Sequence, residues 1–198
     1  MNTHSPVDEL TLVERTLKTI LDRTGKIVPG IPSLGCTEPG HPSTAVLLDV
    51  PGLCQVSSYT CGITSSWSII TALGYRVPLK EWFQRCHKAG CNPDEGMDID
   101  QIGKALKSLR LKVVTKRYQG RSQVAKLVDG GQPIIFGQGA EIFEHGDHWM
   151  YVYGYSPRHV YVGNVVNPVY PIQSKEAWTW RRFENKELNP KELYLINT

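Results

Sequence analysis

The chain has 198 residues, of which 40% are hydrophobic and 21% are charged, and its formal net charge is +3. This composition is typical of a soluble globular protein with one domain, or one domain and an appendage. The cations cluster only loosely, which favours a solvated surface over nucleic-acid binding. No apolar run reaches the ~20 residues of a membrane span, and the N-terminus lacks the regions of a secretory signal. We therefore expect a cytoplasmic protein with no nucleic-acid partner and no membrane span.

The cysteines favour the same compartment. There are five, at irregular spacing, which argues against a disulfide framework and suits the reducing cytosol. Cys86, His87 and Cys91 have the chemistry of zinc ligands, but the CxxC spacing of ribbon-type sites and a second ligand pair are absent. We expect neither a structural metal nor a cofactor.

Residues 1–44 are predicted to form an extension in front of the main domain. Residues 6–24 place aliphatic side chains at near-helical spacing with charges between them, which predicts an amphipathic helix. Residues 28–43 are rich in proline and glycine and predict a loop. We interpret the helix as a packing element, with a propeptide or a partner-docking helix as the alternative. The main domain is then 45–198.

The first half of the main domain is predicted to be mostly helical. After a short strand at 44–50, helices are expected at 61–73, 78–86 and 97–109. The first of these helices has the broad apolar surface of a buried element and ends at Gly74. Asp98 or Asp100 is expected to support the N-terminus of the third.

The second half is predicted to be mostly strands. Strands are expected at 111–118, 133–137, 148–155, 160–166 and 193–196, with short helices at 123–129 and 177–184. The turn residues at 156–159 predict that two of these strands form a hairpin. Helices followed by an antiparallel sheet indicate an α+β fold rather than alternating βαβ units.

One cysteine has a setting that suits catalysis. Cys61 stands where a polar loop turns into the apolar helix, and the positive end of a helix dipole favours the reactive thiolate. Gln55, six residues earlier, could donate its amide to a developing oxyanion, with the backbone N–H of Cys61 as the second donor.

The predicted hairpin supplies candidates for the other roles. His148 begins the first strand and could act as general base toward the thiol. Asn164, sixteen residues later, could accept the imidazole N–H with its amide and hold the ring in the useful tautomer. Each residue alone has an ordinary structural explanation, but the combination of all four is far more specific than its parts.

These motifs resemble a known family. The stretches LLDVPGLCQVSSYTCGITSSWSIITALGY (47–75) and DHWMYVYGYSPRHVYVGNVVNP (147–168) resemble the C39-like branch of the papain superfamily of cysteine peptidases. The resemblance implies a papain-like fold, with N-terminal helices packed on a C-terminal antiparallel sheet. It implies Cys61 as nucleophile, His148 as base, Asn164 as orienter and Gln55 as oxyanion donor.

The third member of the triad has an alternative. Many C39-like members carry aspartate followed by proline there, and the nearer match to that pattern in this chain is Asn167 before Pro168. A simple hairpin with a four-residue turn would also place His148 across from about residue 167. The spacing of the family favours Asn164, and a β-bulge could accommodate the difference. We predict Asn164.

The predicted function is hydrolysis of a peptide bond in a specific peptide or protein, without a cofactor. An acyltransferase or transglutaminase-like amidase would use the same acyl-enzyme with another acceptor. A non-catalytic binding module on the same fold is the third candidate. C39-like relatives fused to transporters trim leader peptides after a double glycine, and this chain contains no transporter part, which indicates a stand-alone version.

Overall fold

The computed structural model describes residues 39–53, 59–138, 148–167, 170–185 and 192–197. Within them the chain forms one antiparallel sheet and five helices. The helices are α2 (Cys61–Ala72), α3 (Leu79–Lys88), α4 (Ile99–Lys107), α5 (Arg121–Asp129) and α6 (Trp180–Phe183). The strands are β1 (Val46–Leu47), β2 (Lys112–Arg117), β3 (Ile134–Gln138), β4 (His148–Tyr155), β5 (His159–Asn167), β6 (Tyr170–Thr179) and β7 (Glu192–Asn197).

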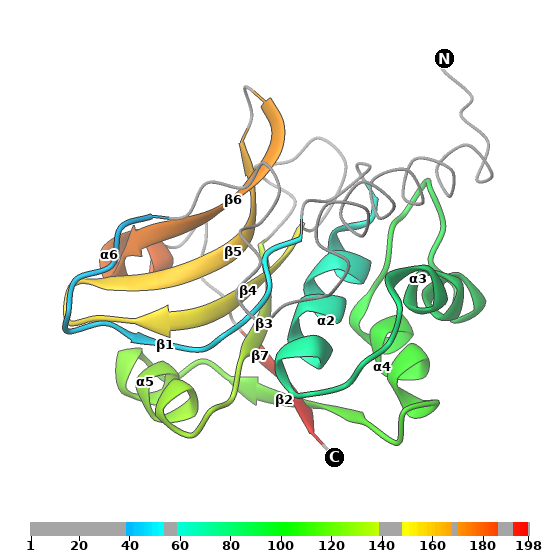
Figure 1. Ribbon diagram of the computed structural model, residues 1–198, viewed down its shortest axis with the longest axis horizontal. Helices are drawn as coiled ribbons and strands as arrows, with labels where there is room; N and C mark the ends of the chain where they lie inside the picture. Colours follow the sequence, from blue (N-terminus) through cyan, green and yellow to red (C-terminus); the bar gives the residue numbers. More distant parts are fainter. Residues whose placement is uncertain (1–38, 54–58, 139–147, 168–169, 186–191, 198) are drawn as a thin grey trace.

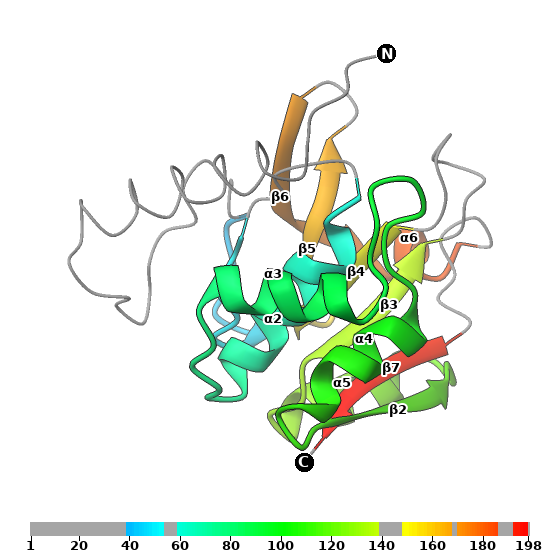
Figure 2. The ribbon, with the colours of Figure 1, turned by 90° about the vertical axis from the view of Figure 1, so that its right-hand side faces the viewer.

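The strand order is β2-β7-β3-β4-β5-β6, and β1 pairs with the later part of β4. The strands β2 and β6 therefore form the two ends of the twisted sheet (Figure 2). Helices α2, α3 and α4 gather on one side of the molecule, apart from α5 and α6 (Figure 1). This confirms the predicted α+β fold with helices packed on an antiparallel sheet.

The predicted helices of the first half are confirmed, with bounds shifted by a few residues. Asp98 is the N-cap of α4 and forms a capping box: its carboxylate accepts from the Gln101 N–H, and the Gln101 side chain accepts from the Asp98 N–H. The hairpin is also confirmed, because the Ser156 N–H donates to the His159 carbonyl across the turn (2.7 Å).

Two predictions in the sheet were wrong in extent. The strand expected at 44–50 is only Val46–Leu47. The helix expected at 177–184 is only α6, because β6 runs through residue 179 and pairs with β5. Residues 175–177 are good helix formers, so their sequence does not show the two-residue period of a strand. In the structure Trp178 pairs with Val160 and its indole is buried, which favours the strand over the helix.

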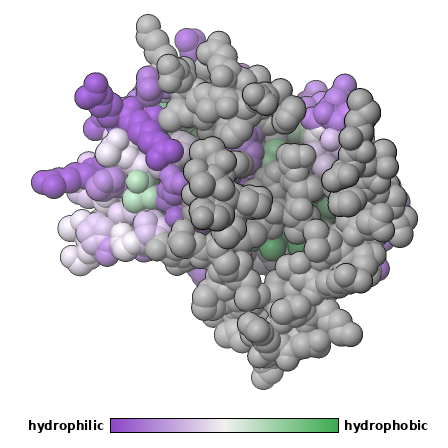
Figure 3. Space-filling model, turned by 90° about the horizontal axis from the view of Figure 1, so that it is seen from above, coloured by the Kyte–Doolittle hydropathy of each residue, from purple (hydrophilic) through white to green (hydrophobic). Residues whose placement is uncertain are grey.

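The sheet has a separate hydrophobic core on each face. Alternate residues of one strand point to opposite cores, as the two-residue period of a strand requires: Tyr151 to the first, and Met150 and Val152 to the second. The first core is closed by α2, α3 and α4, and the second by α5 and α6. From above, hydrophilic side chains collect at one side of the described surface, and small hydrophobic areas show near its centre (Figure 3).

The extension predicted at 1–44 falls almost entirely outside the described residues, as does its helix at 6–24. The division of the chain at residue 44 therefore stays a prediction.

Candidate active site

Cys61 is the first residue of α2, and it is 5% exposed at the edge of the first core. The N–H groups of its first turn have no acceptor within the helix itself. Gly62 allows the helix start to approach its neighbours closely. A Cβ added there would lie 3.1 Å from Met97 Cβ and 3.2 Å from Trp149 Cδ1. The Cys-Gly pair is thus explained by packing as well as by chemistry.

His148 opens β4 and is 5% exposed. Its Nε2 lies 2.6 Å from the main-chain carbonyl oxygen of Asn164. A carbonyl oxygen only accepts, so this hydrogen bond requires the proton on Nε2 and leaves the lone pair on Nδ1. Nδ1 is therefore the nitrogen that can take a proton from a thiol.

Burial lowers the pKa of His148 from its ordinary value near 6.5, and the hydrogen bond to Asn164 opposes this only in part. Burial acts in this direction because it disfavours the charged imidazolium. The imidazole is accordingly neutral near pH 7, which is the form that a general base needs.

Asn164 has a backbone conformation that few residues adopt. Its φ is 62°, in the left-handed region that asparagine tolerates better than most residues. The preceding Gly163 lies beneath the Tyr151 ring, where an added Cβ would come within 2.2 Å of Tyr151 Cζ. The Gly-Asn sequence therefore lets β5 turn its carbonyl toward His148 and its side chain toward α2.

The Asn164 amide joins three segments. Its Nδ2 donates toward the carbonyl of Trp149 (2.7 Å), the hydroxyl of Ser65 (2.8 Å) and the carbonyl of Cys61 (3.2 Å). The structure thus differs from expectation in the atom that meets the imidazole: the main-chain carbonyl accepts, and the amide faces the nucleophile helix.

Asn167 is the last residue of β5 and pairs with the start of β6. Pairing between β4 and β5 passes a register shift and ends at Tyr151 opposite Gly163, one residue before Asn164. The contact to His148 is made by Asn164. The choice between Asn164 and Asn167 as third member of the triad stays a prediction.

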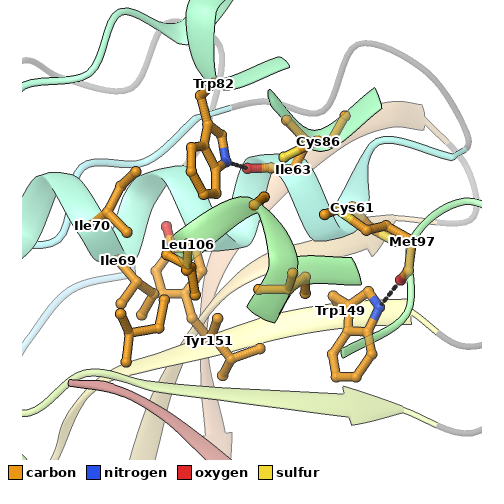
Figure 4. Packing of buried hydrophobic residues seen from close by; sticks show 14 of the residues in the cluster. Cys61, Ile63, Ile69, Ile70, Trp82, Cys86, Met97, Leu106, Trp149 and Tyr151 are labelled. Atoms are coloured by element: carbon orange, nitrogen blue, oxygen red, sulfur yellow. Dashed lines mark hydrogen bonds between the residues drawn. The ribbon is translucent and has the colours of Figure 1, made fainter. Parts of the chain in front are cut away.

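Two further residues, Ser65 and Trp149, complete the surroundings. Ser65 lies one helical turn after Cys61, and its hydroxyl donates to the Trp149 carbonyl (2.9 Å). The Trp149 indole donates to the Met97 carbonyl (2.6 Å), as Figure 4 shows. The spacing of four residues from Cys61 was the only signal in the sequence for Ser65.

Gln55 lies outside the described residues, so its role as oxyanion donor stays a prediction. Within the described ranges, no group of three or more histidine, cysteine or acidic side chains is placed to hold a metal ion. None of the helices in the described part of the chain has both the length and the hydropathy needed to cross a bilayer.

Residues 47–189 match the model of the Peptidase_C39 like family. A search of curated proteins found no match. Among solved structures, the chain is similar to a double glycine motif protease from an AMS/PCAT transporter in complex with the leader peptide. The identity is 18% and the TM-score 0.56, over 76% of this chain and 92% of that one. It is also similar to the peptidase domain of Streptococcus ComA, a bi-functional ABC transporter, at 15% identity and a TM-score of 0.54, over 72% and 93%.

Proposed function

The chain belongs to the Peptidase_C39 like family and is a cysteine peptidase, and on that premise we propose that Cys61, His148 and Asn164 cleave a specific peptide or protein. One observation carries the proposal. Asn164 is hydrogen-bonded both to the His148 ring and to the main-chain carbonyl of Cys61, which supports assigning the base and the nucleophile to these two residues.

In the proposed first step, His148 Nδ1 takes the proton of the Cys61 thiol, and the sulfur attacks the carbonyl carbon of the scissile peptide bond. The negative charge on the resulting oxyanion is held by the Cys61 N–H and the Gln55 side chain. The C–N bond then breaks, and the imidazolium returns its proton to the leaving amine. This leaves a thioester between Cys61 and the acyl half of the substrate.

In the second step, His148 takes a proton from water, and the hydroxide attacks the thioester carbon. The C–S bond breaks, the new carboxylic acid leaves, and the proton returns to the sulfur. The carbonyl of Asn164 keeps the Nε2 proton in place through both steps, so that Nδ1 remains the working nitrogen.

A peptide is the substrate class that this proposal favours. The solved double glycine motif protease is a complex with a leader peptide, and its fold resembles this one. We extend a peptide substrate to this chain on that ground, without assigning a cleavage sequence. A cytoplasmic location and partner docking through residues 6–24 remain predictions.

Transfer of the acyl group to an amine would need the same thioester. No described contact favours an amine acceptor over water, so hydrolysis is the reaction we propose. Adding primary amines to the thioester stage and finding only the free acid would exclude transfer.

The test compares the wild-type protein with Cys61→Ala on peptide libraries and on the products of neighbouring genes, with new termini mapped by mass spectrometry. We expect cleavage by the wild type and none by the variant. Cys86→Ala is the matched control, because burial raises the pKa of the Cys86 thiol well above its ordinary value and keeps it protonated. Undiminished cleavage by Cys61→Ala would end the proposal.

A further inference from the structure

We propose that Ser65 is a positioning residue. Together with the Asn164 amide, it donates a hydrogen bond to the Trp149 carbonyl and so fixes helix α2, which carries Cys61, against strand β4, which carries His148. This inference rests on the proposed function. It concerns a hydroxyl that contacts neither the thiol nor the imidazole in any described hydrogen bond.

Three hydrogen bonds form a closed triangle between α2, β4 and β5. Ser65 Oγ donates to the Trp149 carbonyl (2.9 Å), Asn164 Nδ2 donates to the same carbonyl (2.7 Å), and Asn164 Nδ2 donates to Ser65 Oγ (2.8 Å). Ser65 is fully buried, and Asn164 is 3% exposed. The two amide protons of Asn164 are shared among three acceptors, and because little water competes for these buried groups, losing a partner is costly.

The donor and acceptor roles in the triangle are determined by the groups that form it. A hydroxyl has one proton, and Ser65 gives it to Trp149, so toward Asn164 it can only accept. The amide orientation follows, because its nitrogen faces three acceptors in Trp149, Ser65 and Cys61. Its Oδ1 is buried without a hydrogen-bond partner in the described part of the chain. The contacts of the nitrogen offset the free-energy cost of leaving Oδ1 without a partner.

The position of the triangle links it to catalysis. Trp149 directly follows His148, and the described β4–β5 ladder ends at Tyr151, two residues further along. The start of β4 pairs with β3 on its other side, and the Trp149 carbonyl adds an attachment to β5 and α2 beside the hydrogen bond between His148 and Asn164. Cys61 lies one turn before Ser65 on the same helix, so a shift of the triangle moves the thiol relative to the base.

A neighbouring serine provides the matched control. Ser68 is also in α2 and also fully buried, but its hydroxyl has no hydrogen-bond partner among the described residues. Both Ser65→Ala and Ser68→Ala remove one buried hydroxyl from the same helix. Only the first removes a contact to the strand of His148.

The experiment measures turnover on a cleaved peptide, the pH dependence of iodoacetamide labelling at Cys61, and thermal unfolding for both variants. For Ser65→Ala we expect kcat to fall by roughly 10- to 100-fold with little change in KM, since misplacement by about 1 Å can cost a hundredfold. We also expect labelling of Cys61 to move to higher pH, because the base is less well placed. Ser68→Ala should match the wild type in kcat and in the pH dependence of Cys61 labelling.

Asn164→Asp separates this arrangement from one in which the side chain orients the imidazole. A carboxylate could replace an amide oxygen as acceptor from His148, and such a variant would keep its activity. In the present geometry it would instead face Trp149, Ser65 and Cys61 with oxygens where donors are needed, and we expect at least a tenfold loss of kcat.

Ser65→Ala indistinguishable from Ser68→Ala in kcat and in labelling profile would overturn the inference, as would a fully active Asn164→Asp. A purely structural role would lower the unfolding temperature and leave the labelling profile of the folded protein unchanged, which also counts against it. The labelling arm needs no substrate. Failure to find any cleaved peptide would therefore count against the proposed function alone.

Discussion

The two faces of the sheet are packed by different chemistry. The core under α5 and α6 is built from aliphatic, aromatic and methionine side chains. The core under α2, α3 and α4 is also apolar, but the helix that runs through it carries a series of buried hydroxyls. Those of α2 and its N-cap are Thr60, Thr64, Ser65, Ser66 and Ser68. Cys61 begins this helix and belongs to the core under α2, α3 and α4.

The apolar core and the core with buried hydroxyls are expected to contribute differently, the first to stability and the second to the geometry of the site. A buried hydroxyl contributes less to stability than an apolar group of the same size unless it has a partner, whereas a directional hydrogen bond fixes geometry that apolar contact leaves adjustable. The α5 and α6 face therefore stabilises the sheet, and the polar contacts of the α2 face fix how α2 lies against β4 and β5. Substitutions on the two faces should accordingly separate unfolding free energy from turnover.

The largest effect on stability is expected from Phe136→Ala. Phe136 is fully buried in the core under α5 and α6, and its ring packs against Trp178 and Phe183. Removing it should cost about 3–5 kcal/mol of unfolding free energy, measured by denaturant titration. The fraction that remains folded should turn over as the wild type does. A loss of kcat in that fraction would show that the two faces are coupled.

Gly62→Ala tests the face covered by α2, α3 and α4, and it should cost less stability but more activity. The added methyl would press on Met97 and Trp149, and overpacking of this kind costs about 1–3 kcal/mol. Because Trp149 adjoins His148, we expect kcat/KM to fall by roughly 10- to 100-fold. Gly103→Ala in α4 is the control: its Cβ would meet only Val113, at 3.8 Å. Equal activity of the two variants would contradict the assignment.

Much of this arrangement could be predicted from sequence because it is local. The apolar run after Cys61, the stop at Gly74 and the turn residues of the hairpin each act within a few residues, and all three elements formed as expected. Asn164 could be chosen from its spacing to His148 within the resemblance to the family.

The rest depends on contacts across long separations. Ser65 meets Trp149 across 84 positions of sequence, and a serine on an apolar helix carries no mark of such a partner. The use of the Asn164 carbonyl in place of its amide follows from a φ of 62°, which no spacing rule specifies. Strand β6 was missed for a related reason, since its pairing with β5 outweighs the local preference of its residues.

The charge state of His148 gives a smaller effect, visible in pH dependence. Burial lowers the pKa of His148 in the folded protein. As the pH falls below about 6.5, the unfolded chain therefore takes up a proton at this residue before the folded protein does. Stability is present above that pH and is lost as the pH falls toward the lower folded value, by at most about 1.4 kcal/mol per pH unit for one group. His148→Gln should lack this component. Equal slopes for the two proteins between pH 8 and 5 would contradict the shift.

The smallest effect is expected where polar contacts of the α5 and α6 face reach the solvent. Glu184 accepts from the Tyr118 hydroxyl (3.0 Å) and pairs with Arg121 (2.8 Å), and the Arg121 hydrogen bond lowers the pKa of Glu184. Because the pair is solvated, Glu184→Gln should lower the melting temperature by no more than about 2 °C. The difference should shrink in high salt and vanish as the pH falls through the lowered pKa, where the wild-type carboxylate is itself protonated. Turnover should not change. A loss of kcat from Glu184→Gln would mean that polar contacts on this face also position the catalytic residues, and the division of labour between the two faces would fail.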